Sequence, residues 1–364
     1  MADYQNAHLL LDSGQVHEGN IMWQSPSNIA IVKYWGKYGH QMPRNPSISL
    51  TLDAAHTQTS LSWKNKTAGD NDDVGLEFAF HGAPNEVFRA KMVTFLESLV
   101  PIFPFLKQLQ LSVESENSFP HSAGIASSAS AMSALALCLC SLERELFGTL
   151  HNHTDFLRKA SYIARLGSGS ACRSLYPCAA VWGSSSAMPA ADDYHAAPFA
   201  DELHPIFRTM RDAILLVSRA EKSVSSRAGH ALMEGNPYAA PRYEQANRHL
   251  SAVIGAMRSG DLDTFGRIAE DEALTLHALM MASSPSYILM RPNTLRLIEM
   301  VRDYRTTTAM PLYFTLDAGP NLHLLYPESA AIEIEKFVHA ELLPYCEGGQ
   351  FIADKVGTGP KEMT

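Results

Sequence analysis

The sequence lacks the cysteine pairs, the long apolar runs and the excess of positive charge that mark several classes of protein. Its five cysteines are odd in number and no two have the spacing of a metal site, so we expect reduced thiols that pack as small apolar groups. No apolar run approaches the length of a membrane span, and the N-terminus has neither the basic start nor the apolar segment of a signal peptide. These absences predict a soluble, cytoplasmic protein.

The charge balance is acidic, because 38 Asp and Glu residues oppose 29 Lys and Arg residues and give a net charge of −9. This background argues against a general nucleic-acid surface or an anionic-membrane surface. The 15 histidines are scattered, and no His-x-x-x-His pair accompanies a carboxylate. With 364 residues, of which 46% are apolar, the chain is long enough to bury the cores of two domains.

A loop of small residues in the first half is a candidate anion site. The segment 120–130, PHSAGIASSAS, lies between a strand-like run and an apolar helix-like run. Such a loop directs several backbone N–H groups at one point, where phosphate binds well. Gly124 permits a close backbone approach. Ser127, Ser128 and Ser130 add hydroxyl groups that can cap the helix, contact phosphate or bind magnesium. The same pattern is also typical of a capped buried helix after a glycine turn.

Other polar residues follow predicted strands, where chemistry is often displayed. Lys33 and Lys37 are either an exposed strand end or cations that meet an anionic substrate. The loop 165–174, RLGSGSACRS, combines serines and glycines with Arg173, whose guanidinium matches phosphate oxygens, although a serine-capped helix start gives a similar pattern. Asp317, in FTLDAGPN, is part of an ordinary turn signature and also a carboxylate at the end of a predicted central strand.

The order of the expected elements divides the chain near residue 205. The part at 1–205 has strands ahead of a buried helix, which suits an α+β domain. The part at 206–364 follows the ferredoxin-like order, enlarged by helices in its first crossover. The expected strands are 21–23, 29–34, 45–53, 57–63, 76–80, 108–116, 212–217, 312–316, 321–326 and 349–356, and the expected helical regions are 85–100, 132–142, 154–164, 227–307 and 328–343. In the first helix, Val87 and Phe88 are predicted to be core residues.

Together these segments resemble the GHMP small-molecule kinases and, within them, the mevalonate diphosphate decarboxylases. PHSAGIASSAS is similar to the GHMP phosphate loop, Pro-x-x-x-Gly-Leu-Ala-Ser-Ser, with Ile125 in place of leucine. NIAIVKYWGK, NPSISLTL, RLGSGSACRS, VSSR and DAGPN follow the order and spacing of the decarboxylase branch over about residues 23–326. The resemblance implies a two-domain GHMP-kinase-type α+β fold. Its N-terminal domain would bind ATP, its C-terminal domain would be ferredoxin-like, and the active site would lie in the cleft between them.

The resemblance also implies a reaction. ATP would phosphorylate the tertiary 3-hydroxyl of mevalonate 5-diphosphate, and loss of phosphate and carbon dioxide would give isopentenyl diphosphate. Asp317 would take the hydroxyl proton, Lys33 would stabilise negative charge, and Arg173 would hold the substrate carboxylate. A decarboxylase of mevalonate 5-phosphate, a related kinase and a non-catalytic binding protein remain open as alternatives. Relatives also suggest a homodimer, with no nucleic-acid or membrane partner.

The remaining site residues follow by match to the family motifs. ATP and Mg²⁺ would be the cofactors. The predicted nucleotide-binding residues are Gly124, Ile125, Ala126, Ser127, Ser128 and Ser130, with Ser127 also on the metal. The predicted substrate-binding residues are Asn28, Tyr34, Lys37, Ser168, Ser170, Ser226 and Arg227.

Overall fold

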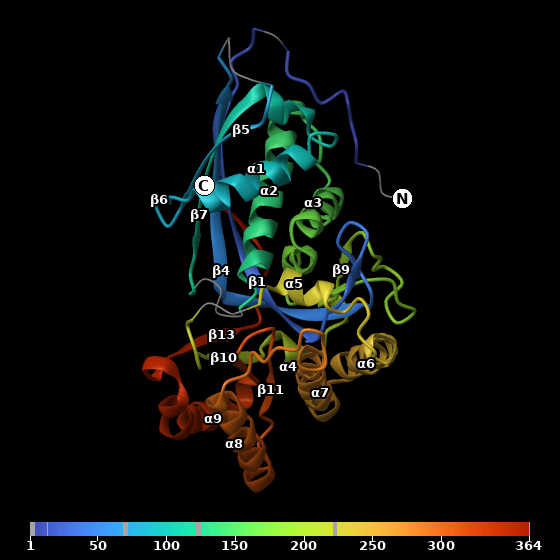
Figure 1. The fold of residues 1–364 in the computed structure, drawn as a ribbon, viewed down its shortest axis with the longest axis vertical. Coiled ribbons are helices and arrows are strands. Elements are labelled where there is room, and N and C mark those ends of the chain that lie inside the picture. Colours follow the sequence, from blue (N-terminus) through green and yellow to red (C-terminus); the bar gives the residue numbers. More distant parts are fainter. Residues whose placement is uncertain (1–3, 13, 68–71, 121–124, 221–223, 364) are drawn as a thin grey trace.

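The computed structural model describes residues 4–12, 14–67, 72–120, 125–220 and 224–363. These residues form a mixed α+β molecule in which helices pack on two separate large sheets (Figure 1). The predicted two-domain α+β class is therefore confirmed. Among the described residues, none of the helices combines the length and apolar character that a bilayer crossing requires.

The larger sheet is built mainly from the first half of the chain. Its strands are β1 (Glu18–Val32), β4 (Ser47–Asn65), β5 (Gly75–Phe80), β6 (Ala83–Pro84), β7 (Leu109–Asn117), β8 (Ala179–Trp182), β9 (Ala196–Pro198) and β14 (Lys361–Met363). They run in the order β14-β1-β4-β7-β5-β6, with β8 paired to β4 and β9 to β8. The last strand of the chain therefore returns to the sheet on which the first strand lies. A separate ribbon joins β2 (Lys37–Tyr38) to β3 (Met42–Pro43).

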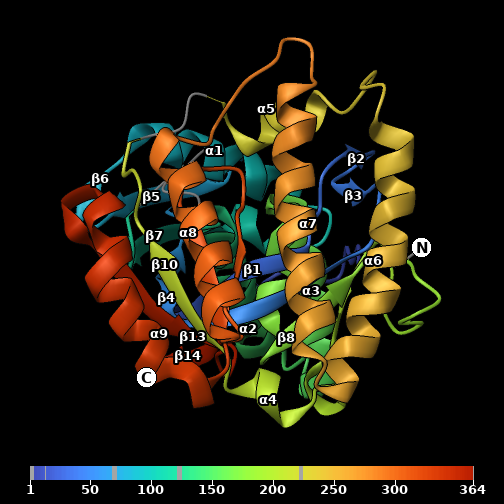
Figure 2. The ribbon, with the colours of Figure 1, turned by 90° about the horizontal axis from the view of Figure 1, so that it is seen from below.

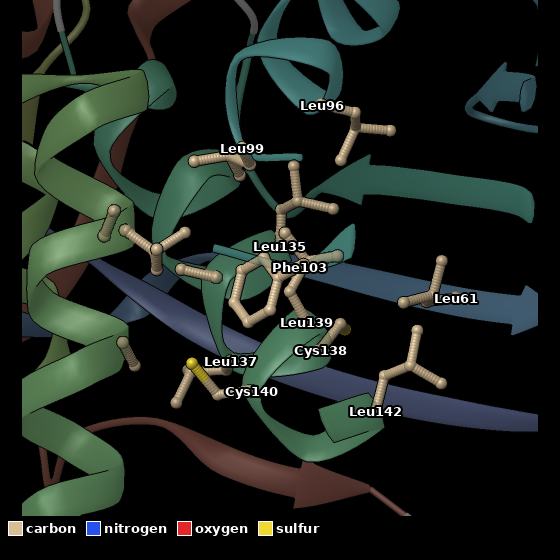
Figure 3. Close-up of a cluster of buried hydrophobic side chains, with 14 of the residues drawn as sticks. Leu61, Leu96, Leu99, Phe103, Leu135, Leu137, Cys138, Leu139, Cys140 and Leu142 are labelled. Carbon is tan, nitrogen blue, oxygen red and sulfur yellow. The ribbon is translucent and has the colours of Figure 1, made fainter. Parts of the chain in front are cut away.

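Three helices cover one face of this sheet: α1 (Glu86–Ser98), α2 (Ser127–Phe147) and α3 (His153–Gly167) (Figure 1). The central helix, α2, carries Leu135, Leu139 and Leu142 into a fully buried apolar cluster against α1 and the sheet (Figure 3). Cys138 and Cys140 lie in the same cluster as free thiols, as the sequence predicts. Since α2 is held along its length, the position of its first turn is fixed.

The smaller sheet has the ferredoxin-like strand order β11-β12-β10-β13, with all pairs antiparallel. Its strands are β10 (Arg211–Leu215), β11 (Tyr313–Thr315), β12 (Leu322–Tyr326) and β13 (Phe351–Lys355). The helices of this half are α4 (Pro205–Arg208), α5 (Ser226–Ala231), α6 (Ala239–Ser259), α7 (Leu262–Met281), α8 (Pro292–Thr308) and α9 (Ala331–Phe337), which continues into a π turn at Val338–Leu342. In Figure 2, α7 lies between α6 and α8.

Successive residues of β10 belong to different cores, because side chains of a strand alternate between its two faces. Ala213 and Leu215 pack with α8 and α9. Ile214 packs on the other face, in a cluster that also contains Ile29 from β1 and Ile48 from β4. This shared cluster joins the two sheets through apolar side chains, so the region between them is fixed by packing.

Two features of the first half differ from the sequence-based expectation. The runs 21–23 and 29–34 form one strand, β1, which continues through bulges near Pro26 and ends at Val32. The runs 45–53 and 57–63 likewise form one strand, β4. A bulge accommodates a proline that cannot donate to the ladder, so the chain bends within one continuous strand where the sequence pattern indicated two strands. The prediction that Val87 is a core residue is wrong, because it is 65% exposed.

Truncation of the α2 core should be strongly destabilising. We predict that Leu139→Ala lowers the free energy of unfolding by about 2–5 kcal/mol, because the removed methyl groups leave a cavity among fully buried neighbours. Urea unfolding followed by circular dichroism measures this loss. Ile332→Ala is the control: Ile332 is 72% exposed, and its truncation should change stability by less than about 0.5 kcal/mol. Equal effects of the two substitutions would contradict this description of the core.

Candidate active site

A buried ion pair joins the two halves of the chain. Lys33 lies immediately after β1, and Asp317 lies between β11 and β12. The Lys33 ammonium donates to Asp317 Oδ1 at 2.9 Å. The side chain of Lys33 is only 2% exposed and that of Asp317 is 23% exposed. The carboxylate is therefore the member of the pair that a ligand can reach.

The surrounding charges keep Asp317 ionised. Burial by itself raises the pKa of this carboxyl, but the charge and hydrogen bond of Lys33, together with His323 and Arg173, outweigh burial and hold its pKa below the ordinary value. Burial lowers the pKa of Lys33, and the Asp317 carboxylate opposes that shift. An ionised carboxylate next to a cation can accept a proton from an approaching hydroxyl group.

The ion pair opens into a cavity of about 420 Å³ between the two halves. Lining the cavity are the predicted site residues Lys33, Tyr34, Lys37, Ala126, Ser127, Ser128, Ser168, Ser170, Arg173, Ser226, Arg227 and Asp317. Segments far apart in the sequence thus meet at one place. The predicted residue Gly124 lies outside the described residues.

The N-terminus of α2 faces this cavity without a side-chain cap. The residue before the helix is Ala126, whose methyl group cannot accept a hydrogen bond and whose backbone has a left-handed conformation, φ 49° and ψ 41°. A non-glycine residue in this region is strained, and such strain is concentrated at functional sites. Ser127 and Ser128 follow, and the Ser128 and Ser168 hydroxyl oxygens are 3.2 Å apart. The backbone N–H groups at the start of α2 and these hydroxyls make a site suited to phosphate.

Arg173 is a buried cation beside this site. It lies in a 3₁₀ segment, Gly169–Leu175, and donates to the hydroxyls of Ser47 at 2.5 Å and Ser49 at 2.9 Å. No carboxylate of the described residues forms an ion pair with its guanidinium. Its hydrogen-bond partners are neutral groups, and the negative charge of Asp317 that acts on it is already paired with Lys33. The buried guanidinium therefore lacks a counter-ion of its own among the described residues, which is unfavourable. The cavity therefore favours an anionic group at Arg173.

Asn28 lies behind Arg173 and does not line the cavity. Its amide donates to the Ser174 hydroxyl at 2.8 Å and to the Ser170 carbonyl at 3.2 Å, and its Oδ1 is 3.4 Å from an Arg173 nitrogen. Asn28 was predicted to bind substrate, but it is not among the residues that line the cavity. The structure instead places it where it orients the arginine.

Two predicted nucleotide-binding side chains also point away from the cavity. Ile125 packs in the apolar cluster between the sheets, and its carbonyl accepts a hydrogen bond from Ser27. Ser130 is fully buried, and its hydroxyl lies 2.6 Å from that of Thr57. Their place in the loop motif suggested contact with phosphate, but Ile125 precedes the helix and packs in the apolar cluster, and the helix directs the Ser130 side chain inward.

A second group of polar residues lines the cavity around the end of β1. Lys37 donates to Gln41 at 2.9 Å, and burial, followed by the nearby Arg227, lowers the pKa of Lys37. Burial raises the pKa of Tyr34, so its hydroxyl stays protonated. That hydroxyl has no hydrogen-bond partner within the described part of the chain. A buried polar group of this kind is normally satisfied, so Tyr34 is available to a polar ligand.

Some cavity residues were not identified from the sequence. Phe88 and Lys91 reach the cavity from α1, which corrects the prediction that Phe88 is purely a core residue. His230, from α5, makes tilted ring contacts with Tyr34 and Trp35, and its Nδ1 accepts the Gly36 N–H at 3.0 Å. His230 was not singled out from the sequence, because only tertiary packing brings its ring to the cavity.

Two buried side chains of α7 hold the backbone next to the ion pair. Glu272 accepts the Lys33 N–H at 2.8 Å, and His277 Nε2 lies 3.1 Å from the Asp317 carbonyl oxygen. Burial is the main reason that the pKa of His277 falls to about 4. A neutral imidazole can donate one hydrogen bond to the carbonyl without adding charge beside Lys33.

Two family models match the chain and together cover most of it. The model of the diphosphomevalonate decarboxylase-like N-terminal domain matches residues 25–194. The model of the mevalonate 5-diphosphate decarboxylase C-terminal domain matches residues 213–362. The diphosphomevalonate decarboxylase of Eremothecium gossypii is 30% identical over 322 residues, which are 83% of this chain and 76% of that protein. The Saccharomyces cerevisiae protein of the same name is 30% identical over 331 residues, 86% of this chain and 80% of the relative.

Solved structures of similar proteins have the same overall fold. A complex of MDDEF with MVAPP, AMPPCP and magnesium superposes with a TM-score of 0.78 at 28% identity and covers 95% of this chain and 99% of that chain. The mevalonate diphosphate decarboxylase from Staphylococcus aureus superposes with a TM-score of 0.79 at 25% identity and covers 96% of this chain and 99% of the other.

The buried state of His277 predicts a pH dependence of stability. Its pKa is near 6.5 in an unfolded chain and about 4 in the folded protein, so between these values the unfolded state binds the proton more readily. The part of the free energy of unfolding that depends on neutral His277 is fully present above pH 6.5 and is lost as the pH falls to 4. We predict that in His277→Gln the free energy of unfolding falls by on the order of 3 kcal/mol less than in the wild type between pH 6.5 and 4. Urea unfolding at several pH values in this range measures the difference. His8→Gln, at an exposed position, is the control and should leave the pH dependence unchanged.

Proposed function

This chain belongs to the diphosphomevalonate decarboxylase family, and from that premise we propose that it decarboxylates mevalonate 5-diphosphate in an ATP-dependent reaction. The products are isopentenyl diphosphate, ADP, phosphate and carbon dioxide, and the reaction is a step of the mevalonate pathway of isoprenoid synthesis. The observation that supports this most directly is the Lys33–Asp317 pair on a cavity that also contains Arg173 and the serine-rich start of α2. Each part matches one chemical group of the reactants.

In the proposed first step, the tertiary 3-hydroxyl oxygen attacks the terminal phosphorus of ATP and ADP leaves. A tertiary alcohol is crowded and weakly acidic, so a carboxylate that orients it and accepts its proton lowers the barrier. Asp317 is the accessible carboxylate of the cavity and takes that proton. The Lys33 ammonium, 2.9 Å from Asp317 Oδ1, keeps the carboxylate ionised and stabilises negative charge on the transferred group.

The nucleotide phosphates are proposed to bind at the N-terminus of α2. Backbone N–H groups of its first turn and the hydroxyls of Ser127 and Ser128 supply donors, and Ala126 leaves this turn uncapped. Magnesium is a hard cation that prefers oxygen ligands from phosphates, water and one or two protein groups, and the Ser127 hydroxyl fits this set. When bound, the metal would supply positive charge against the negative charge of the nucleotide phosphates.

The substrate is proposed to lie with its two acidic ends on different cations. Tyr34, Lys37 and Arg227 line the cavity, and a diphosphate near them would gain donors and positive charge. Ser168, Ser170 and Ser226 add hydroxyls to the lining. The substrate carboxylate then pairs with Arg173, whose guanidinium forms no ion pair with a carboxylate of the described residues. This orientation leaves the 3-hydroxyl near Asp317.

The proposed second step releases phosphate and carbon dioxide. The bond from the tertiary carbon to the phosphate oxygen breaks with its electron pair on oxygen, which leaves positive character on that carbon. The electron pair of the carbon–carboxylate bond then forms the double bond of isopentenyl diphosphate, and carbon dioxide leaves. Arg173, held by Ser47 and Ser49, keeps the carboxylate in one orientation for this elimination.

One assay tests the reaction and the substrate together. Purified protein is mixed with ATP, magnesium and either mevalonate 5-diphosphate or mevalonate 5-phosphate, and released carbon dioxide and phosphate are measured. The proposal requires equal amounts of both products from the diphosphate. Phosphorylated substrate without carbon dioxide would identify a kinase instead, and turnover of the monophosphate alone would overturn the substrate assignment.

We also propose a division of labour within the chain. Residues 1–205 form the GHMP-type domain that binds ATP, and residues 206–364 form the ferredoxin-like domain. The gap between the two family-model matches, 195–212, supports a boundary in this region. The separate sheets support it as well, although β14 returns to the first sheet.

The proposed setting is a cytoplasmic homodimer. The five free cysteines suit a reducing compartment that also supplies ATP. Exposed apolar side chains provide a surface for a second copy: Tyr238 precedes α6, Met281 ends α7 and Ile288 lies in the segment between α7 and α8. Sedimentation velocity at micromolar concentration tests the dimer, and a single species of 40.0 kDa would contradict it.

Removal of the Asp317 charge should abolish catalysis while binding persists. We predict that Asp317→Asn lowers kcat by about 10²–10⁴-fold, because the amide keeps the shape of the side chain but cannot accept the hydroxyl proton. Calorimetric titration should still show binding of ATP and mevalonate 5-diphosphate. Asp303→Asn, at an exposed position on α8, is the control with wild-type kcat. A near wild-type rate for Asp317→Asn would show that another group is the base.

Arg173→Lys should damage use of the substrate. A single ammonium nitrogen lacks the planar fork by which Arg173 reaches Ser47 and Ser49 from two different nitrogens and keeps a third for a carboxylate, so we predict a loss of about 10–100-fold in kcat/KM for mevalonate 5-diphosphate. The affinity for ATP should change little. Arg248→Lys, on the exposed side of α6, provides the matched control. An unchanged kcat/KM would remove Arg173 from the substrate site.

A further inference from the structure

One helix touches the backbone of both members of the reactive ion pair. From α7, Glu272 accepts the Lys33 N–H at 2.8 Å, and His277 bonds to the Asp317 carbonyl at 3.1 Å. We propose that α7 acts as a spacer that sets the distance between Lys33 and Asp317, with Glu272 and His277 as its positioning residues. This inference rests on the proposed function, because it assigns these residues to the alignment of the base and its cation.

The Lys33 peptide needs such support because it lies beyond the sheet. The ladder between β1 and β4 ends at the pair Val32 and Ile48. Beyond this point the Lys33 N–H is taken by Glu272, and its carbonyl accepts hydrogen bonds from Asn45 at 2.9 Å and Arg242 at 3.1 Å. A buried peptide group without such partners is unfavourable. The lysine backbone is therefore fixed mainly by α6 and α7 of the second half.

Glu272 makes more hydrogen bonds than are needed to satisfy the Lys33 N–H alone. It is fully buried, accepts two hydrogen bonds from Arg242 at 2.6 and 2.5 Å, and lies 2.7 Å from His249 Nδ1. Burial raises the pKa of its carboxyl, but His249, Arg242 and the Lys33 N–H outweigh burial and keep the pKa low. Apolar residues of similar size often stabilise a core as well as a buried ion pair does. The charged group instead fixes one orientation of the peptide that it binds.

His277 fixes the other end of the spacer. The Asp317 carbonyl can only accept, so His277 Nε2 carries the proton and donates it. The same carbonyl also accepts the Gly319 N–H at 2.7 Å, which closes the turn that displays the carboxylate. The pKa of His277 is lowered to about 4, so the imidazole stays neutral and places no second positive charge beside Lys33.

The spacing on α7 is rigid. Glu272 and His277 are five positions apart, which corresponds to about 7.5 Å along a helix axis. Figure 2 shows α7 held between α6 and α8, and its residues Phe265, Ile268 and Ala269 are fully buried. Because the helix itself is held in place, a shift of the Glu272 or His277 side chain would change the Lys33–Asp317 distance and leave the position of α7 unchanged. A displacement of about 1 Å can reduce catalysis by up to 10²-fold.

The test compares His277→Leu, which removes the donor, with His277→Gln, whose amide nitrogen reaches a similar position. We expect His277→Leu to lower kcat at least about 10-fold with little change in KM for ATP, and His277→Gln to recover most of the loss. Ile334→Ala, fully buried in α9 and not part of the spacer, is the control that lowers stability without lowering the kcat of the folded enzyme. Equal kcat values for wild type and His277→Leu, per folded molecule, would overturn the proposal.

Glu272→Gln tests the other end of the spacer. The amide retains one acceptor for Lys33 but presents its NH₂ group to Arg242 or His249, which breaks the network. We expect a fall in kcat of similar size to that of His277→Leu. If the Glu272→Gln variant has the kcat of the wild type and circular dichroism shows an intact fold, the buried charge has no role in alignment.

A titration separates this proposal from the proposed reaction. The charged or titratable groups that face Asp317 are Lys33, Arg173, His323 and His277. If His277→Leu lets Lys33 and Asp317 separate, Asp317 loses the cation that lowers its pKa most and titrates at higher pH. Carbon-13 NMR of labelled aspartate carboxyls, with Asp317→Asn to assign the signal, measures this without turnover. An unchanged titration overturns the spacer role, whereas a wild type that releases no carbon dioxide overturns only the reaction.

Discussion

The Lys33–Asp317 ion pair is the interaction around which the molecule is arranged. Its partners are 284 positions apart in the sequence and come from different sheets. Two charges leave water favourably only when their geometry is good and their remaining hydrogen bonds are satisfied. The contact can therefore form only after both halves have folded and packed together, so assembly of the active site and closure of the interface between the sheets are one event.

The apolar interface gives this ion pair its low-dielectric surroundings. Alternation along β10 places Ile214 against Ile29 and Ile48, while its neighbours pack with α8 and α9. One strand thus contributes to the core of the second half and to the joint between halves. A joint made of close-packed side chains tolerates little movement, which suits a site whose reactive groups come from both sides.

The sequence predicted the chemistry better than the support for that chemistry. Lys33, Arg173 and Asp317 lie in short motifs that resemble those of a known family, and all three line the cavity. Their residue types alone left a structural interpretation open for each of them. Glu272 and His277 lie in an ordinary amphipathic helix, and nothing local distinguishes them from other polar residues. Their importance comes from contacts with distant backbone, which spacing along the chain does not encode. The predicted ends of the strands in β1 and β4 were wrong for a related reason. The bulges that keep each strand continuous depend on pairing with distant residues, and the local sequence shows only an interruption of the strand pattern.

The charge of the site runs against the charge of the protein. The chain carries a net charge of −9, yet Lys33, Lys37, Lys91, Arg173 and Arg227 line one cavity with Asp317 as its carboxylate. Cations gathered in this way repel one another and lose hydration, and the serine hydroxyls around Arg173 compensate only part of that loss. A folded state that tolerates this arrangement must draw its stability from the apolar clusters elsewhere. Binding of polyanionic reactants then relieves the repulsion, so the same charges that weaken the free protein supply affinity and alignment in the complex.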